Sequence, residues 1–145
     1  MGIFYHITCR NKECRYHAEL REGNNMYQCR KAKQMTEQIR SGELKVSDKI
    51  MQLLEAGNKI QFVANYLCPK CCEFQTRGEP YLLEELHVSP YGTIREYKLH
   101  YIYGTPVCET CGSELYHILN PRSSKVKCPK CGRDNMKVGG MGYND

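Results

Sequence analysis

Tryptophan is absent from this sequence of 145 residues, and phenylalanine occurs only three times, although there are eleven tyrosines. A chain with so few large apolar side chains is not expected to build a large dry core, and small proteins of this kind need another stabiliser, such as metal. No apolar run reaches the length of about 18 residues that a transmembrane helix requires. The segment 1–6 lacks the features of a signal peptide, so we expect a cytoplasmic protein with reduced cysteines.

The common catalytic and nucleotide-binding motifs are also missing. The sequence contains no Walker A motif, no His-Glu-x-x-His motif and no Gly-x-Ser-x-Gly nucleophile elbow. No set of acidic, basic and nucleophilic residues can be assigned to a reaction. We therefore expect a protein that is not an enzyme, with no small-molecule substrate and no membrane association.

Ten cysteines are the most informative feature that the sequence does contain. Cys108 and Cys111 form one C-x-x-C pair, Cys128 and Cys131 form another, and sixteen residues separate the two pairs. A glycine follows each pair and allows the backbone to leave the turn with positive φ. Zn²⁺ prefers four soft ligands in a tetrahedron, and this spacing falls within the range of known zinc sites. The sequence therefore predicts that these four cysteines bind one Zn²⁺.

A second set of pairs lies in the first half of the chain. Cys9 and Cys14 form a looser C-x₄-C pair, whereas Cys68 and Cys71 repeat the Cys-Pro-Lys-Cys sequence of residues 128–131. This internal repeat suggests that the first half also contains a zinc site, with its two halves separated by 53 residues. We predict that these four cysteines bind a second Zn²⁺, which gives two ions per chain.

Zinc binding changes the charge of the protein. The formal net charge is +5 when cysteines are counted as neutral thiols. Eight thiolates and two Zn²⁺ add a charge of −4, so the loaded protein has a net charge of about +1. The field of the whole molecule therefore gives no argument for nucleic-acid binding, and only local patches can do so.

Two alternatives for the metal sites remain open. In a local scheme, each site draws on ligands that are close in sequence. One site then consists of Cys9, Cys14, His17 and Cys29, and the other of Cys68, Cys71, Cys72 and His87. The split arrangement is favoured because Cys29 lies on the apolar stripe of a predicted helix, and Cys72 occupies the place of the glycine that follows the later pairs. Four thiolates can also hold iron, as in rubredoxin, but the absence of tryptophan favours zinc.

The 53-residue interval contains two predicted helices. Apolar residues recur every three or four positions from Cys29 to Ile39, and again from Ile50 to Leu54. Asn24 or Asn25 can cap the first helix, and Ser47 can cap the second. We therefore predict a helical hairpin at about residues 26–57, inserted into the N-terminal zinc site.

These predictions together describe a small metal-stabilised α+β protein. Two zinc ribbons, each with a site of four cysteines, would consist of short antiparallel β-hairpins. Residues 1–78 would form the N-terminal unit, residues 79–107 a β-rich connector, and residues 108–145 a C-terminal unit with a flexible tail.

The segment from Cys108 to Cys131 resembles the zinc-ribbon superfamily, and the repeated Cys-Pro-Lys-Cys turns strengthen that resemblance. The whole layout also resembles a group of small, uncharacterised bacterial double zinc-ribbon proteins. These combine an N-terminal cysteine pair, a Glu-Leu-Arg-Glu-Gly-like turn, a helical insertion and paired CPxC turns, and residues 19–23 match that turn. The C-x₄-C spacing of the first pair departs from the pattern. The resemblance implies a fold and a metal but no single activity.

Two binding functions are compatible with these features. A protein-interaction adaptor or accessory factor could use the helical hairpin or a tyrosine face made of Tyr97, Tyr101 and Tyr103, and the nearly neutral charge favours it slightly. A nucleic-acid-binding protein could use a cluster of basic residues near the C-terminus. Its members are Arg122, Lys125, Lys127, Lys130, Arg133 and Lys137.

Overall fold

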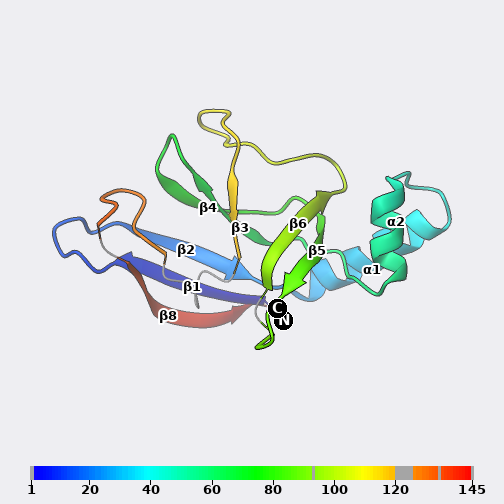
Figure 1. Cartoon of the computed structure of the whole chain (residues 1–145), viewed down its shortest axis with the longest axis horizontal. Coiled ribbons are helices and arrows are strands. Elements are labelled where there is room, and N and C mark those ends of the chain that lie inside the picture. The colour runs from blue at the N-terminus through cyan, green and yellow to red at the C-terminus, as the bar shows by residue number, and fades with distance from the viewer. Residues whose placement is uncertain (1, 93, 120–125, 134, 145) are drawn as a thin grey trace.

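The structure is a computed structural model, and it describes residues 2–92, 94–119, 126–133 and 135–144. The chain is a small α+β protein, as predicted, with antiparallel strands and two helices (Figure 1). In order, the elements are β1 (Gly2–Cys9), β2 (His17–Glu22), α1 (Met26–Arg40), α2 (Asp48–Glu55), β3 (Ala64–Cys68), β4 (Glu73–Arg77), β5 (Tyr81–Val88), β6 (Ile94–Tyr101), β7 (Tyr116–Ile118) and β8 (Met136–Asn144).

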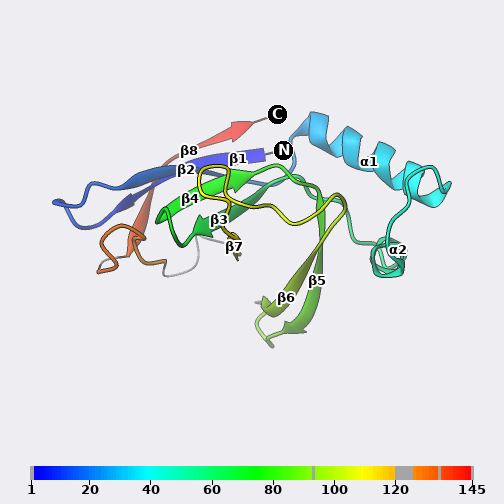
Figure 2. The same cartoon turned by 90° about the horizontal axis from the view of Figure 1, so that it is seen from above.

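The described strands form three small sheets. One has the order β2-β1-β8, the second has the order β4-β3-β7, and the third is the hairpin β5-β6. The first strand of the chain therefore pairs with the last described strand, and both termini lie close together in Figures 1 and 2. This pairing also joins segments 1–78 and 108–145, which we had expected to form separate units.

The C-terminal strand β8 corrects our prediction of a flexible tail. Gly139, Gly140 and Gly142 hide the alternation of a strand and lower its propensity, which is why the sequence did not reveal it. Eight registered residue pairs nevertheless align β8 with β1, from Gly2 opposite Asn144 to Cys9 opposite Met136. A bulge lies beside Gly140, whose φ of 58° is readily adopted only by glycine.

Both predicted helices are present with the predicted caps. The Asn25 side chain accepts a hydrogen bond from the backbone N–H of Gln28, and the Ser47 side chain accepts one from Ile50. Their apolar faces pack with the segment before β3 and with β5. The core members are Ala32, Met35, Ile39, Ile50, Leu53, Leu54, Ile60, Phe62 and Leu82. Within the described residues, neither helix is long and apolar enough to cross a membrane.

The first helix contains one departure from expectation. Cys29, which we had placed on the apolar stripe, is exposed, whereas Ala32 and Met35 are buried. Its thiol lies 3.9 Å from the carbonyl oxygen of Asn24.

The two three-stranded sheets pack against each other through a mixed apolar and polar interface. Tyr5, Ile7 and Leu20 from the first sheet form a core with Phe74 from the second. Asn65 on β3 is almost fully buried, and its side chain bonds both the backbone N–H and the carbonyl of Arg21 on β2. This side chain substitutes for ladder bonds between the sheets and fixes how they meet.

Candidate metal centres

The structure collects the eight predicted ligand cysteines into two groups of four. The terminal site consists of Cys9, Cys14, Cys128 and Cys131. The central site consists of Cys68, Cys71, Cys108 and Cys111. Within each group all four sulfur atoms lie within 4.8 Å of one another, and each group could hold a metal ion.

The sulfur positions fit a tetrahedral ion. Sulfur atoms at the usual Zn–S distance of about 2.3 Å from one ion are about 3.8 Å apart in a tetrahedron. In the terminal site the Cys9–Cys131 distance is 3.7 Å and the Cys14–Cys128 distance is 3.6 Å. In the central site the Cys68–Cys111 and Cys71–Cys108 distances are 3.5 and 3.9 Å. None of the ten cysteines forms a disulfide, so these groups are not disulfide pairs.

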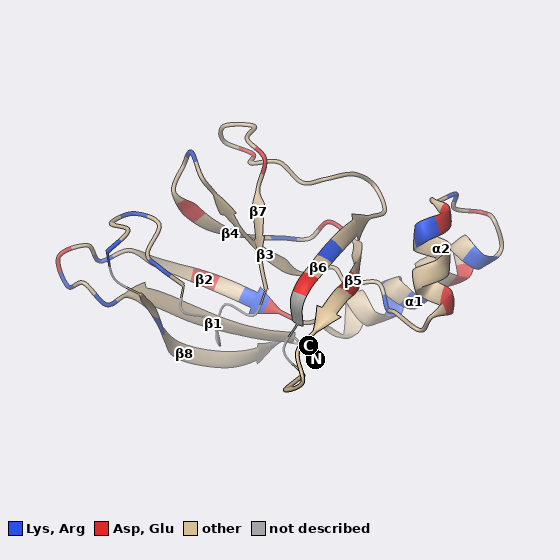
Figure 3. Cartoon of the chain, in the orientation of Figure 1, with Lys and Arg blue, Asp and Glu red and all other residues tan. Residues whose placement is uncertain are grey.

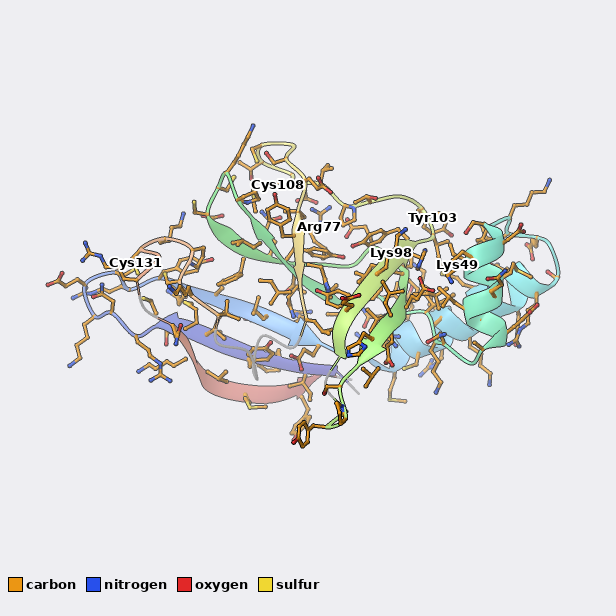
Figure 4. All side chains as sticks on the ribbon, in the orientation of Figure 1. Lys49, Arg77, Lys98, Tyr103, Cys108 and Cys131 are labelled. Atoms are coloured by element: carbon orange, nitrogen blue, oxygen red, sulfur yellow. The ribbon has the colours of Figure 1, made fainter. Side chains whose placement is uncertain are left out.

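The grouping differs from our prediction, which joined the first pair with the second and the third with the fourth. The structure nests the pairs instead, so that the first meets the fourth and the second meets the third. Figure 4 shows Cys108 and Cys131, which we had placed on one ion, at separate ends of the sheets. The local scheme is also wrong, because neither group contains Cys29 or Cys72, and both contain only cysteines.

Strand pairing explains the nested arrangement. Cys9 ends β1 opposite Met136 at the start of β8, so antiparallel pairing brings the turn at 128–131 beside the N-terminal pair. In the same way, β3 runs into Cys68, and its partner β7 begins soon after Cys111. Each metal group thus lies where a strand ends and its antiparallel partner begins.

All four cysteine pairs lead into a residue with a left-handed backbone. Gly112 and Gly132 have φ values of 74° and 66°, and each donates its N–H to the carbonyl of the first cysteine of its pair. Cys72 and Arg15 occupy the same place with φ values of 53° and 56°. The interpretation of Cys72 as a substitute for that glycine is therefore confirmed.

The central site contains a hydrogen bond from a side chain that sequence reasoning missed. Gln75 on β4 donates from Nε2 to the Sγ of Cys108 at 3.2 Å. Together with the backbone N–H groups of Cys111 and Thr110, this bond lowers the pKa of Cys108 to about 6. Gln75 lies opposite Tyr66 in the β3–β4 ladder, so only the strand register reveals its position.

The thiols of Cys9 and Cys71 hold their protons more tightly than an ordinary cysteine when no cation is present. Burial raises the pKa of Cys9 to about 12. The pKa of Cys71 is also raised to about 12, mainly by its hydrogen bond to Cys111. A divalent cation would replace these protons and convert each group to thiolates. Four thiolates around one ion leave no open coordination position, which suits a structural ion rather than a catalytic one.

Lys130, one of the predicted nucleic-acid contacts, bonds within the protein. Lys130 of the fourth pair donates from Nζ to the carbonyl of Cys71 at 3.0 Å, and its Nζ lies 3.5 Å from Glu73 and 6.0 Å from the centre of the Tyr16 ring. This lysine therefore links the terminal site to the central site. Of the other predicted contacts, Lys127, Arg133 and Lys137 are exposed, and Arg122 and Lys125 lie outside the described residues.

The proposed tyrosine face is not a single exposed surface. Tyr97 donates from its hydroxyl to the carbonyl of His117, and the hydroxyls of Tyr101 and Tyr66 lie 2.8 Å apart. Burial lowers the pKa of His117 to about 4, so it is a neutral member of this aromatic cluster. Only Tyr103 of the three proposed residues is strongly exposed, at 69%.

The nested arrangement brings together basic residues that are far apart in sequence. Arg10 donates its backbone N–H to the carbonyl of Asn135, and Asn135 forms an antiparallel β-bridge with Lys127. The basic residues around the first and last cysteine pairs therefore lie at the same end of the molecule. We name this surface the basic end. Its members are the exposed residues Arg10, Lys12, Arg15, Lys127, Arg133 and Lys137 (Figure 3).

Comparison with known proteins identifies no relative. No protein-family model matches the chain, and neither a curated protein nor a solved structure matches it.

Proposed function

We propose that this chain is a non-catalytic zinc-ribbon-type protein that holds two structural Zn²⁺ and binds nucleic acid through its basic end. The closed sets of four thiolates, with sulfur separations close to those of a zinc tetrahedron, support the structural role of the metal. The two ions would stabilise a fold whose apolar cores are small.

The main support for nucleic-acid binding is the difference in charge between the segments around the two cysteine sites. Residues 1–22 and 126–144, which surround the terminal site, contain eight Lys and Arg against four Asp and Glu. Residues 64–119, around the central site, contain four against seven. After a charge of −2 is assigned to each zinc tetrathiolate, the terminal half carries about +2 and the central half about −5. A nearly neutral protein therefore has one end suited to phosphates.

The adaptor function has less support. Tyr97 and Tyr101 direct their hydroxyls to partners within the protein, which leaves Tyr103 alone as an exposed aromatic anchor of that set. A protein-binding surface usually contains a cluster of anchors rather than one.

The experiment is a binding titration with fluorescent RNA and DNA at two salt concentrations. Replacing Lys12, Lys127 and Lys137 with Ala should weaken binding and reduce the log–log salt slope by roughly 0.7–0.9 for each lost phosphate contact. The matched control removes three exposed lysines from other surfaces. These are Lys45, Lys70 and Lys98. An absence of binding at low salt, or an equal loss in both triple variants, would refute the assignment.

A further inference from the structure

One face of the β2-β1-β8 sheet is exposed. The side chains of Tyr5, Ile7 and Leu20 point to the core, so alternation places their neighbours on the opposite face. In Figure 2, strands β3, β4 and β7 lie on one side of this sheet. We name the opposite side the outer face. Its residues are Phe4, His6, Thr8, His17, Glu19, Arg21 and Lys137.

Aromatic rings lie along the middle of the outer face. Phe4 and His6 occupy β1, and His17 on β2 lies opposite Thr8, one step further along. His6 and His17 are exposed. The three rings therefore occupy successive steps across two neighbouring strands.

The glycines of β8 leave this row open on one side. Gly142 lies opposite Phe4, and Gly139 lies opposite His6. The tip of the Phe4 ring lies over Gly142, since a Cβ atom there would be 2.4 Å from the ring carbon Cζ. A Cβ on Gly140 would be 3.6 Å from Cδ2 of His6. These glycines carry no side chain, so β8 does not cover the two rings at the positions beside them.

The charges on this face are mostly positive. Lys137, which belongs to the basic end, lies opposite Thr8, and the exposed Arg21 lies opposite Phe4. Glu19 is the one acidic residue of the outer face, and its carboxylate lies near both Arg21 and His6, at 3.6 and 4.0 Å. A phosphate backbone that leaves the basic end would therefore meet one further cation, Arg21, along the sheet.

We infer that the outer face binds single-stranded nucleic acid, with bases stacked on His6, His17 and the ring of Phe4, and phosphates held by Arg21 and by the basic end, which includes Lys137. This inference rests on the proposed function and specifies its ligand. Stacking on protein rings requires unpaired bases, because a duplex hides the faces of its bases between neighbouring pairs. Rings on an exposed sheet with cations beside them give the two elements that single-strand binding combines.

The test compares a labelled oligothymidylate of about 12 nucleotides with a labelled duplex of the same length, within the footprint of a single-strand-binding fold. The zinc-loaded full chain should bind the single strand more tightly than the duplex. His6→Ala combined with His17→Ala should weaken single-strand binding by at least about fivefold, the least effect expected for one lost stacking contact.

Two further variants separate stacking from other effects. His87 is an exposed histidine on β5, outside this face, so His87→Ala should leave binding unchanged. His17→Phe should retain single-strand binding because it preserves a ring without the imidazole. Zinc content and the unfolding transition of each variant report whether the fold is intact.

The outcomes distinguish the inference from the function on which it rests. Equal affinity for single strand and duplex, with no effect of the histidine variants but weaker binding in the Lys12, Lys127 and Lys137 variant, would overturn the stacking face and leave the proposed function standing. No binding of either probe at low salt would overturn both. Preference for the single strand, with weaker binding in the double His6→Ala and His17→Ala variant but not in His87→Ala or His17→Phe, supports the inference.

Discussion

Gln75 offers a direct test of how the central site is tuned. Its Nε2 lies 3.2 Å from the Sγ of Cys108, and this bond is the main cause of the lowered pKa of that thiol. The change Gln75→Leu keeps a side chain of similar size but removes the donor. The thiolate of Cys108 would then lose a partner that favours its charged form.

Loss of a hydrogen-bonding partner outside the ligand set typically reduces metal affinity by about 10- to 100-fold, which corresponds to about 1.4–2.7 kcal/mol. The loss of metal affinity should affect the central site alone, since Gln75 bonds a cysteine of that site. It should also grow as the pH falls, because a Cys108 thiol with a raised pKa competes more strongly for a proton.

Chelator competition followed by native mass spectrometry measures the two release steps separately. We expect the Gln75→Leu variant to lose one ion at a lower chelator concentration and to retain the other as the parent does. Gln52→Leu, on the exposed side of α2, is the matched control. Equal weakening of both ions, or no change in either, would refute this account of Gln75.

Two other predictions concern stability. Burial lowers the pKa of His117 from 6.5 to about 4, so the folded protein binds a proton at this site less readily than the unfolded chain does. The free energy of unfolding should therefore fall by up to about 3 kcal/mol as the pH drops from about 6.5, the pKa of the unfolded chain, to about 4. Denaturant unfolding across this range should show a shallower pH dependence in His117→Gln, and an unchanged dependence would contradict the burial argument. Gly142→Ala should displace the ring of Phe4 and destabilise the β1–β8 pair by about 1 kcal/mol, whereas Gly139→Ala, with open space around its Cβ position, should cost less. Equal thermal unfolding midpoints for the two alanine variants would show that the Phe4 ring can move aside without loss of stability.

The eight cysteines that gather into groups of four and the positions of the helices were predictable because each depends on short-range rules. C-x-x-C spacing and a following left-handed residue mark a metal-binding turn wherever it occurs, and Cys72 shows that the rule holds even without glycine. The caps Asn25 and Ser47 define helix starts through bonds to residues three positions away.

The pairing of the turns depends on long-range strand partners, which spacing does not encode. Either grouping of four C-x-x-C-like turns gives two tetrahedra with the same local chemistry. The pairing of β8 with β1 determines which cysteine turns meet. Sequence patterns did not predict β8, because its three glycines have low strand propensity and interrupt the alternation of apolar and polar residues. The basic end was missed for the same reason, because the β1–β8 pairing brings the segment with Arg10, Lys12 and Arg15 beside Lys127.

Hydrogen exchange in the Cys131→Ser variant shows whether the eight cysteines are grouped as the structure has them. If Cys131 shares an ion with Cys9 and Cys14, its loss should release one ion and remove protection from β1 and β8 at opposite ends of the sequence. Residues 64–77 and 108–118 should stay protected, because the central site keeps its four ligands. Protection that is lost at 108–118 and retained at 2–9 would mean that Cys131 shares its ion with Cys108 and Cys111, and the nested arrangement would be wrong.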